Sequence, residues 1–158
     1  MRGYVSLKAF RGSEFRLYGG PYMQKPKGMT GVKMAAEIKA QCAVDIPTRD
    51  FCTPGLEHMQ KGLLETIKLI LDGKPVYAGC MGGIGRTGLI LALVVKAWGI
   101  KDPVAYVRKN YYAHAVETQE QLKYVSEFVI DPKIKKMIFW AKVKNLLKSK
   151  KLLTNPYQ

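Results

Sequence analysis

The sequence predicts an α/β fold in which helices flank a central, mostly parallel β-sheet. Short apolar segments, such as 42–46 and 75–79, alternate along the chain with longer segments of helical character, such as 54–71 and 89–98. This alternation is typical of strand–helix–strand units, in which consecutive strands lie parallel in one sheet. The length of 158 residues suffices for a substantial buried core, so we expect a single domain over residues 1–158.

The predicted elements follow in order from the N-terminus. Residues 2–10 and 15–18 form short strands. Gly19-Gly20-Pro21 and Lys25-Pro26-Lys27-Gly28 break the pattern, and the segment between them is expected to form a substrate-side loop. The chain then continues with a short helix over 32–40, a strand over 42–46, a helix over 54–71, a strand over 75–79 and a helix over 89–98. An N-cap residue followed by proline at the first helical position marks three helix starts: Thr53-Pro54, Asp102-Pro103 and Asp131-Pro132.

The segment 80–88 carries the strongest chemical signal in the chain. Cys80 and Arg86 lie six positions apart, and three of the five residues between them are glycines. A predicted strand precedes this segment and a predicted helix follows it. The turn from a strand into a helix leaves several backbone N–H groups without intrahelical partners, and a curled loop makes them converge on one point. The segment therefore predicts a cradle for an oxyanion such as phosphate.

Each residue type in this segment has a physical reason. Gly82, Gly83 and Gly85 have no Cβ, so they permit positive φ values and a close approach of the backbone to an anion. The planar guanidinium of Arg86 can bind two phosphate oxygens at once. A helix N-terminus and a nearby cation favour the thiolate form of Cys80, and a thiolate beneath a bound phosphate is positioned for in-line attack.

Other interpretations of the same segment are weaker. Residues 83–88 also fit the pattern G-x-G-x-x-G, but a dinucleotide site requires a second strand that ends in an acidic residue about 20 residues later. Here Lys101-Asp102-Pro103 opens another helix instead. A Walker loop is disfavoured because Arg86 replaces its lysine and the glycine spacing differs. A cysteine that serves only as a small buried apolar side chain remains the simplest alternative for Cys80.

The segment resembles the signature loop of the cysteine-dependent phosphatases, the superfamily of protein tyrosine and dual-specificity phosphatases. Their pattern is a cysteine, five residues, an arginine and then Ser or Thr, which is matched here by Cys80, Arg86 and Thr87. Residues 46–54 resemble the segment that carries the general acid of this family, and residues 116–122 resemble the segment that carries its water-orienting glutamines. The resemblance implies a protein tyrosine phosphatase-like fold.

The resemblance also implies a mechanism, the hydrolysis of phosphomonoesters through a phosphocysteine intermediate. Cys80 would attack phosphorus, and Asp50 would protonate the leaving oxygen and then deprotonate the attacking water. Thr87 would donate a hydrogen bond to the sulfur, and Gln121 would help to place the water. No cofactor and no metal are implied. The residues expected to bind the phosphoryl oxygens are Met81, Gly82, Gly83, Ile84, Gly85 and Arg86.

Three positions leave alternatives open. Asp45 is a second candidate for the general acid, although it lies inside a predicted strand, whereas Asp50 lies in a loop. Most family members have a histidine directly before the nucleophile, where this chain has Gly79. Glu117 replaces the first of the paired glutamines. The last two departures motivate an alternative of another class, a phosphate-binding module with weak activity.

The formal net charge of +14 is the second informative property of the chain. A lysine-rich helix is predicted from about residue 132. One interpretation is a solvated terminal helix that docks through an apolar stripe, and the other is recruitment to a polyanion such as RNA or anionic lipid, favoured by Phe139 and Trp140. The stripe consists of Ile134, Met137, Ile138, Ala141 and Leu147, and the lysines are Lys133, Lys135, Lys136, Lys142, Lys144, Lys148, Lys150 and Lys151.

Three substrate classes fit this reading of the sequence. The first is a phosphorylated protein, in which phosphotyrosine is the main target. Additional activity on phosphoserine or phosphothreonine is left open. The alternatives are RNA 5′ ends and phosphoinositides. The chain has no run of about 18 apolar residues and no apolar signal core, so we expect no transmembrane segment. Its three cysteines, Cys42, Cys52 and Cys80, lack paired spacing, which favours a reducing, cytoplasmic location.

Overall fold

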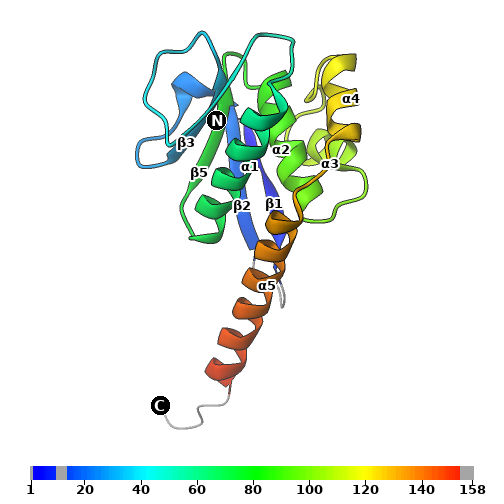
Figure 1. Cartoon of the computed structure of the whole chain (residues 1–158). Helices are drawn as coiled ribbons and strands as arrows, with labels where there is room; N and C mark the ends of the chain where they lie inside the picture. Colours follow the sequence, from blue (N-terminus) through cyan, green and yellow to red (C-terminus); the bar gives the residue numbers. More distant parts are fainter. Residues whose placement is uncertain (1, 10–13, 154–158) are drawn as a thin grey trace.

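The computed structural model describes residues 2–9 and 14–153, with side chains to residue 144 (Figure 1). Its five strands form one mixed sheet in the order β1-β2-β5-β3-β4. The β1–β2 pair is antiparallel and the other three pairs are parallel, so the predicted mostly parallel α/β sheet is confirmed. The strands are β1 (Gly3–Lys8), β2 (Glu14–Pro21), β3 (Thr30–Ala35), β4 (Val44–Thr48) and β5 (Val76–Cys80).

The helices flank this sheet, and helix α2 is the most buried of them. It is apolar nearly all round, and its residues 85–95 are all buried, which is typical of a helix inside a core. It packs against β5, α3 and α4, whereas α1 contacts β4 and α5. The helices are α1 (Leu56–Leu71), α2 (Gly85–Ala97), α3 (Pro103–Asn110), α4 (Gln119–Glu127) and α5 (Pro132–Leu153), and a short 3₁₀-helix, η2, spans Tyr22–Gln24.

The arrangement of β5 and α2 determines where a site can form. Strand β5 is the central strand of the sheet and is buried along its whole length. Only residues 81–84 separate its carboxyl end from the N-terminus of α2. In open α/β sheets the carboxyl ends of the central strands are the usual place for ligand binding, because helix N-termini and loops converge there.

The region 19–40 differs from its prediction. Strand β2 continues through Gly19 and Gly20 to Pro21, where a break in the pattern was predicted, and pairs there with β5. The helix predicted over 32–40 is wrong, because residues 30–35 form strand β3. This strand lies between β5 and β4, and all of its residues after Thr30 are buried. A strand buried on both faces has no polar alternation, so its sequence resembles that of a buried helix.

Two predicted boundaries also moved. The strand predicted over 42–46 begins at Val44 and includes Pro47, which an edge strand such as β4 tolerates because one side of its backbone forms no ladder. The helix predicted from Pro54 begins at Leu56, with Gly55 as its N-cap. Thr53 does not cap α1, because its hydroxyl instead donates to Glu120 of α4 (Oγ1–Oε1 2.6 Å).

The other predicted helix starts are confirmed. Asp102 caps α3 by accepting a hydrogen bond from the Ala105 N–H at 2.9 Å, and Asp131 accepts one from the Lys133 N–H at 2.7 Å. Helix α5 begins at Pro132 and docks on the body through Ile134 and Ile138, both of which are buried. Its later turns extend away from the body (Figure 1).

The predicted stripe on α5 is confirmed for its first part only. Met137 packs against the core beside the two buried isoleucines, and Ala141 is half-buried. The side chain of Leu147 lies outside the described part of the structure. Over the residues searched, no helix combines the length and the apolar character that a membrane crossing requires.

Candidate active site

The loop between β5 and α2 forms a tight curl around the side chain of Cys80. Gly83 has a φ of +68°, and a Cβ at this position would overlap the backbone of Gly20 and Pro21. Both conditions require glycine. The hydroxyl of Tyr111 donates to the carbonyl of Gly83 at 2.6 Å and so fixes the loop from below. Burial raises the pKa of Tyr111, so this hydroxyl stays a donor over the physiological range.

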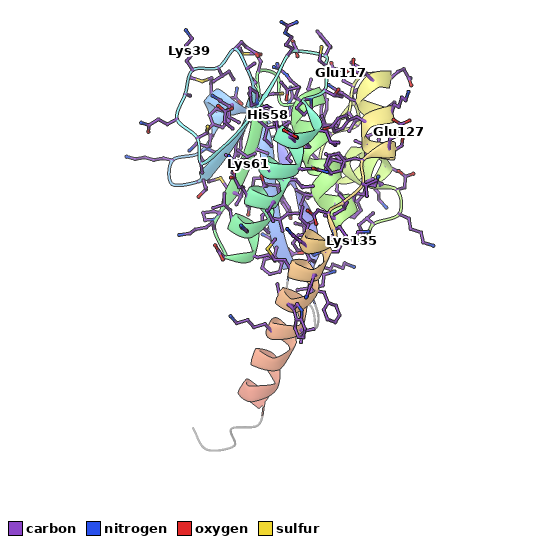
Figure 2. The ribbon with its side chains drawn as sticks, in the orientation of Figure 1. Lys39, His58, Lys61, Glu117, Glu127 and Lys135 are labelled. Carbon is purple, nitrogen blue, oxygen red and sulfur yellow. The ribbon has the colours of Figure 1, made fainter. Side chains whose placement is uncertain are left out.

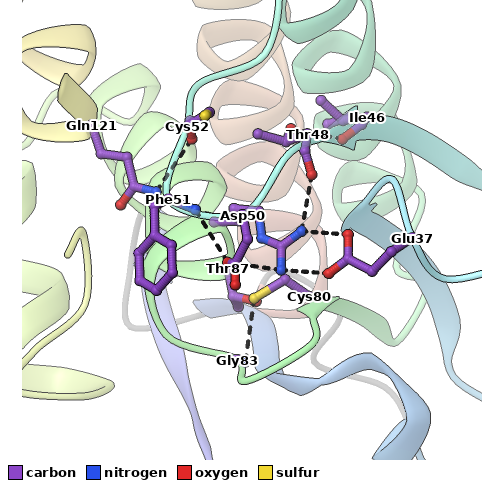
Figure 3. Close-up of polar contacts among 11 residues, drawn as sticks. Glu37, Ile46, Thr48, Asp50, Phe51, Cys52, Cys80, Gly83, Thr87 and Gln121 are labelled. Atoms are coloured by element: carbon purple, nitrogen blue, oxygen red, sulfur yellow. Dashed lines mark hydrogen bonds and ion pairs between the residues drawn. The ribbon is translucent and has the colours of Figure 1, made fainter. Parts of the chain in front are cut away.

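The sulfur of Cys80 lies at the base of this curl. Its Sγ accepts hydrogen bonds from the Gly83 N–H and from the Thr87 hydroxyl, both at 3.2 Å (Figure 3). Only 3% of Cys80 is exposed, yet the residue lines a surface pocket. Hydrogen bonds donated to sulfur stabilise negative charge on it, so these two donors fit a thiolate nucleophile.

The backbone around Gly79 explains why no histidine precedes the cysteine. A Cβ on Gly79 would lie 2.7 Å from Cα of Tyr22 and 2.8 Å from the carbonyl oxygen of Gly20. Both neighbours are backbone atoms, which cannot move aside as a flexible side chain can. A side chain at position 79 is therefore excluded by the close approach of β2 and η2 to β5.

Arg86 is held by a network that sequence analysis did not predict. Its guanidinium donates from Nη1 and Nη2 to the two carboxylate oxygens of Glu37, both at 2.7 Å (Figure 3). Nη1 also donates to the Thr48 carbonyl at 2.9 Å. The arginine side chain is 1% exposed, and among the described residues its Nε has no hydrogen-bond partner. This nitrogen is the group that a bound oxyanion would satisfy.

Glu37 and Arg86 shift each other's protonation in opposite directions. The hydrogen bond from Arg86 lowers the pKa of Glu37, against the raising effect of its partial burial. Burial by itself lowers the pKa of Arg86, but the Glu37 hydrogen bond and the nearby acidic groups outweigh it and raise the pKa. No sequence pattern pointed to Glu37, because it lay inside a predicted helix and here occupies the turn after β3.

The structure brings Asp50 to the same guanidinium. Its Oδ1 lies 3.0 Å from Nη2 of Arg86, and its side chain is 58% exposed. Asp45, the second candidate acid, instead pairs with Lys33 at 3.1 Å on the neighbouring strand β3. Phe51, which directly follows Asp50, has a φ of 61°, a strained conformation for a bulky residue.

Besides the bond from the Thr53 hydroxyl to Glu120, three polar contacts attach this acid-bearing loop to the start of α4. The Thr118 hydroxyl donates to the Phe51 carbonyl at 3.1 Å, and the Thr53 N–H donates to Glu120 at 3.0 Å. Gln121 donates from Nε2 to the Cys52 carbonyl at 3.3 Å. These contacts join residues 51–53 to residues 118–121, so the start of α4 holds the strained backbone beside Asp50 in place.

Gln121 lies near the loop but uses its side-chain amide elsewhere. It is fully buried, and its Oε1 accepts a hydrogen bond from the Glu117 N–H at 2.9 Å. With Thr118 it completes a capping box at the start of α4. A Cβ on Gly85 would lie 3.0 Å from Oε1 of Gln121, so the amide stands beside the loop without facing the pocket mouth.

Glu117, in contrast, lines the pocket. Its carboxylate borders Gly85, where a Cβ would lie 2.5 Å from Oε2. The preceding residue, Val116, has a φ of 58°, which is unusual for a β-branched side chain. Arg108 holds this turn by donating to the carbonyls of Ala115 and Val116 at 3.0 and 2.9 Å. The fold therefore fixes the backbone from which Glu117 reaches the pocket.

The pocket has a volume of about 270 Å³. Phe51 and Met81 are 58% and 52% exposed and form an apolar part of its wall. The predicted phosphate-binding residues lie together in the loop beneath it. The lining residues are Asp50, Phe51, Cys80, Met81, Gly82, Ile84, Gly85 and Glu117.

Comparisons with known proteins agree with this geometry. A model of the family described as "Polymorphic toxin system, DSP-PTPase phosphatase" matches residues 25–99. Two uncharacterised proteins of Methanocaldococcus jannaschii are 38% and 40% identical to the chain over 85 residues, which is 53% of this chain. The match spans 57% and 53% of these relatives, about half of their length.

A solved structure is similar in fold. Tk-PTP in its active form superposes with a TM-score of 0.57 and 25% sequence identity, over 65% of this chain and 79% of that chain. The family match covers the loop with Cys80 and Arg86 and the segment with Asp50. The fold, the signature loop and these matches support the superfamily of cysteine-dependent phosphatases, which comprises the protein tyrosine and dual-specificity phosphatases, as the one that this chain resembles.

Proposed function

We propose that this protein hydrolyses phosphomonoesters through a phosphocysteine, with phosphotyrosine in proteins as its main substrate. One observation carries the proposal. The Cys80 sulfur lies at the base of a pocket, with two hydrogen-bond donors on it and with the unpartnered Nε of Arg86 in the same loop. This arrangement supplies a nucleophile and an oxyanion cradle, and Asp50 supplies a carboxyl group at its edge.

In the first step the Cys80 thiolate attacks phosphorus, so an S–P bond forms as the P–O ester bond breaks. Protonated Asp50 gives its proton to the leaving oxygen, which departs as an alcohol or phenol. Arg86 and the loop N–H groups stabilise the charge on the three equatorial oxygens. Glu37 supports this step by fixing the plane of the guanidinium through both of its terminal nitrogens.

In the second step water attacks the phosphocysteine, and Asp50 accepts a proton from it. The S–P bond breaks, the sulfur leaves as a thiolate, and inorganic phosphate is released. The donors Thr87 and Gly83, each 3.2 Å from Sγ, stabilise the departing charge. We assign the placement of the water mainly to Glu117, because its carboxylate lines the pocket, whereas the Gln121 amide is engaged in the capping box.

The pocket wall favours an aryl phosphate. Phe51 and Met81 offer exposed apolar surface on which an aromatic ring can pack. Apart from Arg86 in the loop beneath, the described lining of the pocket brings no lysine or arginine, and it includes the carboxylates of Asp50 and Glu117. A substrate with several phosphates, such as a triphosphate-ended RNA or a polyphosphorylated inositide, requires additional cations there. The pocket charge thus supports a monophosphorylated substrate over these two alternatives.

The proposal is tested with a panel of substrates and two cysteine variants. Wild-type protein should release phosphate from a small aryl phosphate and from a phosphotyrosine peptide, and more slowly from phosphoserine peptides, RNA 5′ ends and inositol lipids. Cys80→Ser should abolish turnover, whereas Cys42→Ser, at a half-buried thiol outside the site, should retain it. Turnover that survives Cys80→Ser would refute the mechanism. Phosphate binding without turnover in the wild type would instead favour a binding module.

A further inference from the structure

Helix α5 exposes aromatic side chains directly beside the residues that dock it. Ile134 and Ile138 are buried against the body, but the next two residues, Phe139 and Trp140, are 54% and 57% exposed. Their rings pack edge to face, with centroids 5.6 Å apart. From here the helix continues to Leu153, away from the body (Figure 1). Two adjacent aromatic residues on a projecting helix form an apolar surface without a partner among the described residues.

The sequence of the projecting part extends this apolar pattern. Counted from Phe139, apolar residues follow at i+4, i+7 and i+8, as Val143, Leu146 and Leu147, which is the spacing of one helix face. Helix α5 contains no acidic residue and eight lysines. Among the lysines with described side chains, Lys133, Lys135, Lys136 and Lys144 are exposed. The helix therefore combines an apolar series with a concentrated positive charge.

We infer that α5 binds the surface of an anionic lipid bilayer. A basic helix with aromatic and leucine residues on one face lies at the boundary between headgroups and acyl chains, with its lysines on the anionic headgroups. The lysines alone would suit a nucleic acid equally well. The aliphatic residues Val143, Leu146 and Leu147 decide between the two partners, because aromatic rings can also stack on exposed bases, whereas a nucleic acid offers aliphatic side chains little apolar surface.

Helix α5 and the pocket lie near opposite ends of helix α2. Lys142 of α5 lies against Trp98, the C-cap residue of α2, with its Nζ 3.5 Å from the carbonyl oxygen. The pocket, in contrast, is lined by Ile84 and Gly85 at the other end of α2. Helix α2 has 13 residues, so its two ends lie about 20 Å apart.

The figures agree with this separation. Glu117, which lines the pocket, and Lys135, near the start of α5, lie at opposite ends of the body in Figure 2. A protein held by α5 would therefore carry its pocket at the end of the body that is remote from the docked start of the helix.

The inference is tested by co-sedimentation of the full chain with vesicles. We expect binding to vesicles of phosphatidylcholine with phosphatidylserine, and little binding to phosphatidylcholine alone. The double variant F139S/W140S should weaken binding by about tenfold or more, because it removes apolar surface that enters the interface. Met23→Ser removes an apolar side chain that is 72% exposed outside α5, and it should bind as the wild type does.

A second pair of variants tests the charge. The double variant K136E/K144E should weaken vesicle binding by about tenfold or more, whereas Lys61→Glu on α1 should change it far less. Thermal unfolding of each variant reports its folding independently of any phosphatase activity. Equal vesicle binding by the wild type and F139S/W140S would overturn the inference. Binding to single-stranded RNA without binding to vesicles would overturn it in favour of a nucleic acid.

Discussion

The carboxylate of Glu37 binds both terminal nitrogens of Arg86, at 2.7 Å each, from the turn that follows strand β3. The two residues are 49 positions apart in the sequence, and the order of the strands brings them together. The same guanidinium contacts Asp50 at 3.0 Å. Arg86 thus links the signature loop to the turn that carries Glu37 and to the loop that carries Asp50. The orientation of its guanidinium depends on these contacts.

Replacement of Glu37 should lower activity without unfolding the protein. Glu37→Gln keeps the size of the side chain but turns one acceptor into a donor that opposes the arginine N–H groups. We expect kcat/KM for a small aryl phosphate to fall by about 10- to 100-fold, because the plane of the Arg86 guanidinium, which binds the oxyanion, is no longer fixed. Glu127→Gln, at the last residue of α4, is the matched control and should leave kcat/KM unchanged. Wild-type kinetics in Glu37→Gln would contradict this role.

The Glu37–Arg86 pair should also contribute to the pH dependence of stability. Its hydrogen bond with Arg86 lowers the pKa of Glu37, so folding favours the ionised form. The stabilisation is therefore complete above the ordinary glutamate pKa of about 4.3 and is lost as the pH falls through the lower folded value. Thermal unfolding from neutral pH to acid should show a smaller decline in Tm for Glu37→Gln than for the wild type. An identical decline would show that this pair makes no such contribution.

A side chain at position 79 should destabilise the fold. Gly79→Ala places a Cβ 2.7 Å from Cα of Tyr22, so the backbone of β5 or η2 must move. We expect the free energy of unfolding to fall by about 1–3 kcal/mol, the usual cost of overpacking. Gly82→Ala is the control in the same loop, because beyond its chain neighbours the atom nearest to its Cβ would be Cδ1 of the Ile84 side chain, at 4.0 Å. Chemical denaturation measures both variants, and equal stabilities would refute the packing argument.

Glu117 and Gln121 should affect different properties. Glu117→Ala should slow hydrolysis of the phosphocysteine, so that labelled phosphate accumulates on the protein in rapid-quench experiments while the first step proceeds. Gln121→Ala should mainly lower the free energy of unfolding, by about 1 kcal/mol, through loss of the capping box. The converse result, with phosphoenzyme accumulation in Gln121→Ala alone, would assign the water to Gln121.

The anion cradle could be predicted because its determinants are local in sequence. A buried strand, a glycine-rich turn and a helix start follow one another between Val76 and Ala97, and few conformations satisfy all three. Sequence reasoning likewise identified the capped starts of α3 and α5, since the N-cap and the proline act within one turn. These features needed no knowledge of the remaining fold.

Tertiary structure decided the features that depend on distant neighbours. Lys33, Met34 and Ala35 favour a helix, yet they form the end of β3 because the sheet places this segment between β5 and β4. The contact of Arg86 with Glu37 follows from the same strand order. So does the need for glycine at position 79, where neighbouring backbone leaves no room for a side chain. The groups that carry the chemistry are evident in the sequence, because a nucleophile and its cradle occupy one short segment. Only the packed sheet decided how those groups are held, because hydrogen bonds and steric contacts between remote segments exist only after the strands have paired.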